Sequence, residues 1–126
     1  MSATSIAVVD DEAPVRTALR RLLRLGGYDV AVYESGEEFL ASLAARVPDC
    51  VVLDIHMQGL SGFDVVAHLG ASHARIPTVF ITASDDPDLD DAVCRAGVEQ
   101  LLRKPFSSDA LLAAVETALG TKPKAS

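Results

Sequence analysis

The sequence lacks any apolar run that approaches 18 residues, and its N-terminus lacks a basic region followed by an apolar stretch. A membrane span needs about 20 apolar residues and a secretory leader needs that N-terminal pattern, so neither is predicted. Basic residues are also few, with 11 Lys and Arg against 18 Asp and Glu and a net charge of -7. This charge argues against nucleic acid or an anionic membrane as a partner of the chain. We therefore expect a cytoplasmic protein that contacts neither.

Cysteine is scarce as well. Cys50 and Cys94 show no metal-ligand spacing and lie in an apparent strand and an apparent helix, which favours buried free thiols over a disulfide. No internal repeat or low-complexity linker divides the 126 residues, which are enough for one domain that folds without a disulfide or a metal. We expect this domain over residues 1–120 and a disordered tail or linker over residues 121–126.

Short apolar runs alternate with helical patterns from end to end. The predicted strands are 6–10, 29–34, 50–54, 76–83 and 99–103. A helical pattern follows each, and its start is indicated by Pro14, by Ser35, by Ser61, by Asp86 before Pro87, and by Ser107 or Ser108. Five strand–helix units joined by short loops predict a doubly wound five-stranded parallel sheet with helices on both faces, a three-layer α/β/α domain.

Polar residues occupy the ends of the predicted strands. Asp10 and Asp11 come at the end of the first, Asp54 ends the third, Thr82 lies at the end of the fourth and Lys104 follows the fifth. Ligands of a doubly wound sheet bind beyond these carboxyl ends. Converging carboxylates suit a hard divalent cation such as Mg²⁺, and a carboxylate can also attack phosphorus. A lysine and a threonine would then supply a positive charge and a hydroxyl to phosphoryl oxygens.

Each of these residues also has an ordinary structural explanation. Acids at 10–12 suit the positive end of a helix dipole, Asp54 suits a turn, and Thr82 suits a hydrogen-bonded hydroxyl. The joint pattern, with one polar position at each of several strand ends, favours a binding site. Lys104-Pro105, directly after a strand, is a candidate cis peptide bond.

These residues and their surroundings resemble the receiver domain of two-component response regulators. The matching segments are VVDDE (8–12), VVLDIHMQGLSGFD (51–64), PTVFITA (77–83) and AGVEQLLRKPF (96–106). The loop after Asp54 and the KPF run look most similar to FixJ-like regulators. The resemblance extends from Ile6 to about Leu119, and it implies a flavodoxin-like sheet of strand order 2-1-3-4-5 with five helices.

The resemblance also implies roles for the acids. Asp54 would accept a phosphoryl group from a histidine kinase or a phosphotransfer protein. Asp11, Asp54 and the backbone carbonyl of His56 would bind Mg²⁺, with Asp10 acting mainly through water. The implied function is phosphorelay signalling by a domain that is no enzyme beyond catalysing its own phosphorylation and dephosphorylation.

Thr82 and Lys104 would hold the phosphoryl oxygens. In most receivers an aromatic residue on the fifth strand rotates inward when the threonine moves, but Leu101 stands at that position here. The resemblance implies that an output domain or a second copy docks on the face formed by the fourth helix, fifth strand and fifth helix.

Other functions share parts of this pattern. An aspartate-dependent phosphohydrolase needs a second acid two residues after its nucleophile, where this chain has His56. A P-loop nucleotidase needs a G-x-x-x-x-G-K-[ST] run, which is absent. A flavodoxin-like electron carrier needs a phosphate-cradling loop after the first strand, and here that loop is anionic. The alternative left open is a receiver-shaped module that binds a partner without phosphorylation.

Overall fold

The computed structural model describes residues 3–71 and 75–120, where five parallel strands form one sheet of order β2-β1-β3-β4-β5, as predicted. The strands are β1 (Ser5–Val9), β2 (Asp29–Tyr33), β3 (Cys50–Asp54), β4 (Thr78–Thr82) and β5 (Gln100–Arg103). The helices are α1 (Ala13–Leu25), α2 (Gly36–Ser42), α3 (Gly62–Ala71), α4 (Asp88–Arg95) and α5 (Ser108–Gly120). The predicted tail over 121–126 lies outside the described residues. No helix within the described ranges is long and apolar enough to cross a membrane.

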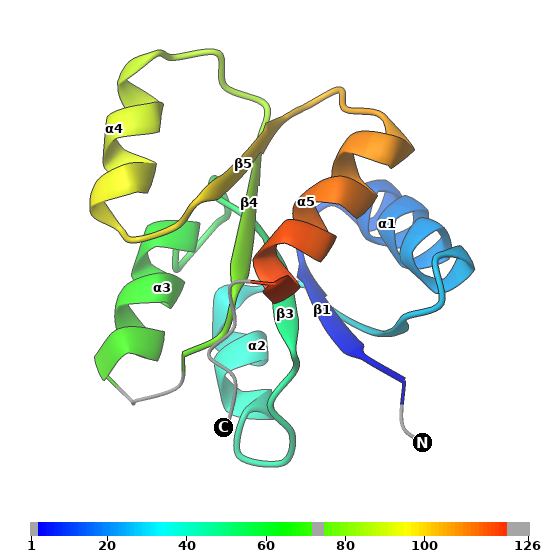
Figure 1. The fold of residues 1–126 in the computed structure, drawn as a ribbon. Coiled ribbons are helices and arrows are strands. Elements are labelled where there is room, and N and C mark those ends of the chain that lie inside the picture. Colours follow the sequence, from blue (N-terminus) through cyan, green and yellow to red (C-terminus); the bar gives the residue numbers. More distant parts are fainter. Residues whose placement is uncertain (1–2, 72–74, 121–126) are drawn as a thin grey trace.

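Helices cover both faces of the sheet, with α1 and α5 on one face and α2, α3 and α4 on the other (Figure 1). Successive residues of a strand point to opposite faces. Val8 and Val52 therefore join the cluster under α1 and α5, while Val9 and Leu53 join the cluster under the other three helices. Because both faces are covered, β1 and β3 are apolar along nearly their whole length.

Helix α4 begins one residue later than predicted. Pro87 holds the N-cap position that the sequence assigned to Asp86. The Asp86 carboxylate still accepts a hydrogen bond from the backbone N–H of Asp88, at 2.9 Å. The Asp86 side chain thus still binds a backbone N–H at the start of the helix, but it does so from the residue before the N-cap, because Pro87 already has helical backbone angles.

The two cysteines differ in burial. Cys50 is fully buried in β3, and this burial raises the pKa of its thiol to about 12. Cys94 is exposed, so the prediction of a buried thiol is wrong for this residue. On α4, Leu89 and Val93 are buried, and the next residue lies about 100° further round the helix, on the solvent side.

A thiol reagent should therefore modify Cys94 in the native protein and leave Cys50 unreacted, since the thiolate is the nucleophile and Cys50 is both buried and protonated. Intact mass should show one label per chain before unfolding in urea and two labels after it. A Cys94→Ser variant should take up no label until it unfolds. Rapid native labelling of that variant would contradict the burial of Cys50.

Candidate functional site

The carboxyl edge of the sheet gathers the polar residues predicted from the sequence. Asp54, the last residue of β3, is 4% exposed, and Thr82, the last residue of β4, is fully buried. Asp10, directly after β1, is also fully buried. These are the three buried polar or charged residues in the described part of the chain, and all three lie at one edge. Burial of polar groups is costly, and this chain concentrates that cost in one place.

Asp10 is held by several polar contacts. One carboxylate oxygen accepts a hydrogen bond from the backbone N–H of Glu12 at 2.9 Å, and the other lies 3.2 Å from Lys104 Nζ. The backbone carbonyl of Asp10 accepts a hydrogen bond from the Arg16 guanidinium at 2.8 Å. A buried carboxylate is tolerated when it is paired and fully hydrogen-bonded. Lys104, which follows β5, and Arg16 on α1 therefore hold Asp10 in place.

Asp10, Asp11 and Glu12 form a carboxylate cluster. One oxygen from each lies within 4.8 Å of the others, and Asp11 and Glu12 are exposed to solvent. Asp11 also accepts a hydrogen bond from the backbone N–H of Gln58, at 3.4 Å, in the loop after β3. Such oxygen donors with a solvent-open side fit Mg²⁺, which keeps several of its waters. Asp54, predicted as a metal ligand together with Asp10 and Asp11, is not a member of this close group, and Glu12 is its third acid.

The carboxyl group of Asp54 has a raised pKa. Burial raises the pKa of its carboxyl from 3.8 to about 6, and the charge of Asp10 and, more weakly, that of Asp11 raise the pKa as well. Lys104 and the backbone N–H of His56, 3.4 Å from Oδ1, act in the opposite direction. Asp54 is therefore a poorly solvated carboxylate facing other negative charges, and a nearby cation would relieve that cost.

The start of α3 packs directly against the end of β3. A Cβ on Gly62 would lie 2.9 Å from the carbonyl oxygen of Asp54 and 2.9 Å from Cα of Ile55, so this approach requires glycine. The N–H of Gly62 donates to the carbonyl of Ile55 at 2.9 Å. Ser61 and Asp64 cap the helix reciprocally, each side chain accepting from the other's backbone N–H. The loop after Asp54 is thus fixed by hydrogen bonds where it meets α3.

Thr82 and Lys104 connect the ends of β4 and β5. The Thr82 carbonyl accepts a hydrogen bond from the backbone N–H of Lys104 at 2.7 Å, and Thr82 Oγ1 accepts one from the N–H of Ser84 at 3.0 Å. The Lys104–Pro105 peptide bond is cis. The side chain of Lys104, 19% exposed, runs back to Asp10 at the end of β1. The ends of β1, β4 and β5 are therefore connected through the carboxyl edge.

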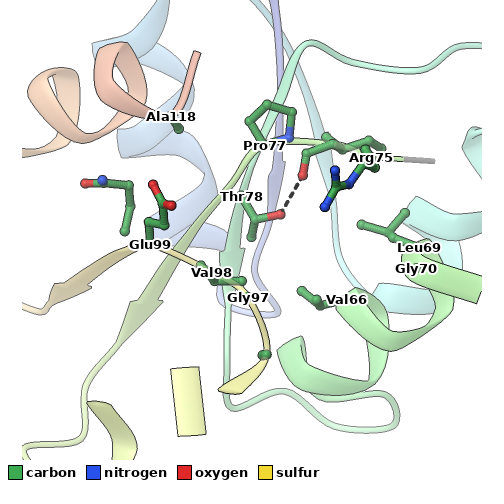
Figure 2. A pocket seen from close by; sticks show the side chains of 13 residues that line it. Val66, Leu69, Gly70, Arg75, Pro77, Thr78, Gly97, Val98, Glu99 and Ala118 are labelled. Atoms are coloured by element: carbon green, nitrogen blue, oxygen red, sulfur yellow. Dashed lines mark hydrogen bonds between the residues drawn. The ribbon is translucent and has the colours of Figure 1, made fainter. Parts of the chain in front are cut away.

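A groove of about 370 Å³ lies at the opposite edge of the sheet (Figure 2). Residues at the starts of β4 and β5 line it, and there the Thr78 hydroxyl donates to the carbonyl of Ile76 at 2.9 Å. Val66 and Val98 line it, and Glu99 is an acid in its wall. None of the acids of the carboxyl edge borders this groove, so it is separate from the candidate site.

The fold and the site together define a class: a flavodoxin-like α/β domain with a carboxylate-lined site at the carboxyl edge of its sheet. The model of the response regulator receiver domain family matches residues 6–116. The chain therefore belongs to this family and is a receiver domain of the kind found in two-component response regulators, which act in phosphorelay signalling. Phosphorylation and Mg²⁺ binding at an acidic pocket are general features of such domains.

Individual relatives agree with this assignment. The solved structure of FixJ-N is similar with a TM-score of 0.89 and 30% identity, over 98% of this chain and 99% of that one. A receiver protein from Burkholderia phymatum is 41% identical with a TM-score of 0.82, over 92% and 94%. The transcriptional regulatory protein TdiR of Thauera aromatica is 36% identical over 94% of this chain and 52% of its own length. This chain spans about a quarter to a half of the length of the first curated relatives it matches.

The raised pKa of Asp54 predicts a pH-dependent cost to stability. Above pH about 6 the carboxylate is charged in the folded protein and the full cost is present, whereas below 3.8 it is protonated in both states and the cost is gone. In the presence of a chelator, Asp54→Asn should therefore raise the unfolding free energy at pH 7.5 by up to about 3 kcal/mol. The gain should shrink as the pH falls through 6 toward 4, as measured by urea unfolding.

The exposed acid Asp85 offers a matched control. Asp85→Asn removes one negative charge from the surface and should shift stability by little at either pH. A stabilisation by Asp54→Asn that is the same at pH 7.5 and pH 4 would show that repacking, and not the charge of Asp54, is responsible.

Proposed function

We propose that this chain is a phosphoacceptor in which Asp54 takes a phosphoryl group from the histidine of a kinase or of a phosphotransfer protein. A carboxylate oxygen of Asp54 attacks phosphorus, the bond from phosphorus to the donor nitrogen breaks, and the histidine keeps the electron pair. The observation that carries this proposal is the placement of Asp54: a nearly buried carboxylate at the carboxyl edge, with a lysine ammonium among the charges that act on it.

Lys104 and Thr82 supply donors for the oxygens of the transferred group. The Lys104 ammonium has three N–H donors, so it can keep its contact with Asp10 and donate to a phosphoryl oxygen at the same time. Thr82 Oγ1 accepts from Ser84, which leaves its own O–H free to donate. Lys104 is held by its contact with Asp10 before the reaction, and Thr82 would move toward the phosphoryl group to donate to it.

The donor set fits a divalent metal of the hard class. Asp11, Asp54 and the carbonyl of His56 would hold Mg²⁺, with Asp10 acting through water, and the exposed Glu12 carboxylate stands close enough to contribute. When bound, the metal neutralises charge on the phosphoryl oxygens. The chain's own acids supply the negative field that draws the cation into the site.

The output of the domain is a change in what binds to it. We propose that phosphorylation alters docking on the face formed by α4, β5 and α5, where an output domain or a second copy would bind. Leu101 on β5 is half-buried against the cluster under α2, α3 and α4. Because leucine has no hydroxyl to find a new partner, this strand should itself change little. We place this activity in the cytoplasm, with no nucleic acid bound by the domain alone.

Acetyl phosphate and Mg²⁺ should raise the intact mass of the protein by one phosphoryl unit. Asp54→Asn should show no such gain, because the carboxylate nucleophile is lost. Asp64→Asn, a change at an acid in the first turn of α3, should leave the gain intact. A persistent mass increase in the Asp54→Asn variant would assign the acceptor to another residue.

Mg²⁺ should stabilise the fold by mass action. At ten times its Kd the expected gain is about 1.4 kcal/mol, or a few degrees in Tm. Asp11→Asn should strongly reduce this gain by removing a ligand, and it should raise the metal-free Tm because it relieves repulsion within the cluster. Asp109→Asn on α5 serves as the charge-matched control and should keep the full response. An undiminished response in Asp11→Asn would remove this acid from the ligand set.

A further inference from the structure

The side chain of Arg103, the last residue of β5, contacts the loop between β4 and α4 and the helix beyond it. Its Nε donates to the carbonyl of Ser84 at 3.3 Å, and Nη2 donates to the carbonyl of Asp86 at 3.2 Å. The same guanidinium pairs with both carboxylate oxygens of Asp90, at 3.3 Å from Nη1 and 3.1 Å from Nη2. One side chain thus ties β5 to the loop and to the first turn of α4.

The loop that Arg103 holds is also the loop bonded to Thr82. The N–H of Ser84 donates to Thr82 Oγ1 at 3.0 Å, and Ser84 Oγ accepts from the N–H of Asp86 at 3.2 Å. Thr82 is itself the register partner of Arg103 across β4 and β5. A displacement of the Thr82 hydroxyl therefore moves Ser84, and the Ser84 carbonyl is bound to the guanidinium.

Arg103 lies on the face of β5 where a readout residue is expected. Residues two apart in a strand share a face, so Arg103 is on the same side of the sheet as Leu101. Leu101 packs against the cluster that α4 helps to cover. Its apolar side chain has no directional contact to lose or gain when the loop moves, whereas Arg103 has two hydrogen bonds to the loop and two to Asp90 on α4.

These contacts govern geometry more than stability. The side chains of Arg103 and Asp90 are 36% and 59% exposed, and ion pairs exposed to solvent contribute little to the free energy of folding. The guanidinium is planar and presents its donors in a fixed fork, so it defines the direction of each acceptor. Removing it should leave a folded domain in which the loop and α4 are no longer held to β5.

We propose that Arg103 is a positioning residue that couples Thr82 to α4. It sets where the loop after β4 lies, and it transmits the movement of Thr82 to the first turn of α4 when Asp54 is phosphorylated. The coupling rests on the proposed function, since it needs a phosphoryl group to move Thr82. It assigns the readout to an arginine at the end of β5 in place of a side chain at position 101.

The test is amide NMR of the full chain with Mg²⁺ and beryllofluoride as the phosphoryl mimic. Wild-type protein should show shift changes at Thr82, at Ser84 and across residues 88–91. In Arg103→Met the changes at Thr82 and Ser84 should persist, while those across 88–91 should fall to about half or less. Without the guanidinium, binding of the mimic favours neither position of α4 strongly over the other.

Three further variants separate positioning from a general structural effect. Arg103→Lys keeps the charge but not the planar fork, so it should restore only part of the α4 response. Arg95→Met removes an exposed arginine from the last turn of α4 and should respond as the wild type does. Leu101→Ala should lower stability through a packing defect and keep the α4 response.

The outcomes are distinguishable. A wild-type α4 response in folded Arg103→Met overturns the coupling and leaves the proposed function standing. A wild-type protein that shows no change at Thr82 overturns the proposed function. If Arg103→Met does not fold, Asp90→Ala decides, since it removes both acceptors at the α4 end of the contact from an exposed position. A reduced response across 88–91 supports the coupling, and an unchanged one overturns it.

Discussion

The ion pair between Asp10 and Lys104 is the interaction on which the arrangement of the site depends. Its two residues follow β1 and β5, which are not neighbours, because β3 and β4 lie between them in the sheet. In the strand order, Asp54 at the end of β3 and Thr82 at the end of β4 therefore come between the two paired residues. Removing one partner of a buried pair costs about 3–5 kcal/mol because the other charge is left uncompensated. The pair thus ties the end of β1 to the end of β5.

This pair also sets the electrostatics of Asp54. The charge of Lys104 lowers the pKa of Asp54, but burial and the charge of Asp10 raise it by more, so the balance leaves the carboxyl near 6. A single lysine cannot offset all the acids of the edge. The remaining negative charge is a driving force for binding a cation, and a cation would in turn keep Asp54 ionised. The repulsion within the acidic run and the proposed metal site are two aspects of one charge balance.

Sequence patterns predicted the layers, the bounds of β3 and the edge at which the polar residues meet, because these follow from apolar periodicity and from the geometry of parallel sheets. The prediction that Cys94 is buried was wrong, because a step of one residue along α4 turns the side chain by about 100°, from the buried side to the exposed side. The contacts of Arg103 were not predicted. A long side chain on the surface takes its direction from tertiary neighbours, and a lone arginine before Lys104 has no local signature.

The chain keeps the polar edge of a receiver but carries an apolar residue at position 101, which changes how a signal can leave the site. A bound group shifts a conformational equilibrium only through interactions that differ between the two states. The contacts of Leu101 are non-directional and differ little between nearby positions of the loop. The hydrogen bonds of Arg103 are directional, so a small shift of the Ser84 carbonyl changes their free energy. Coupling by arginine therefore needs a movement of the loop alone, and no side chain has to cross the core.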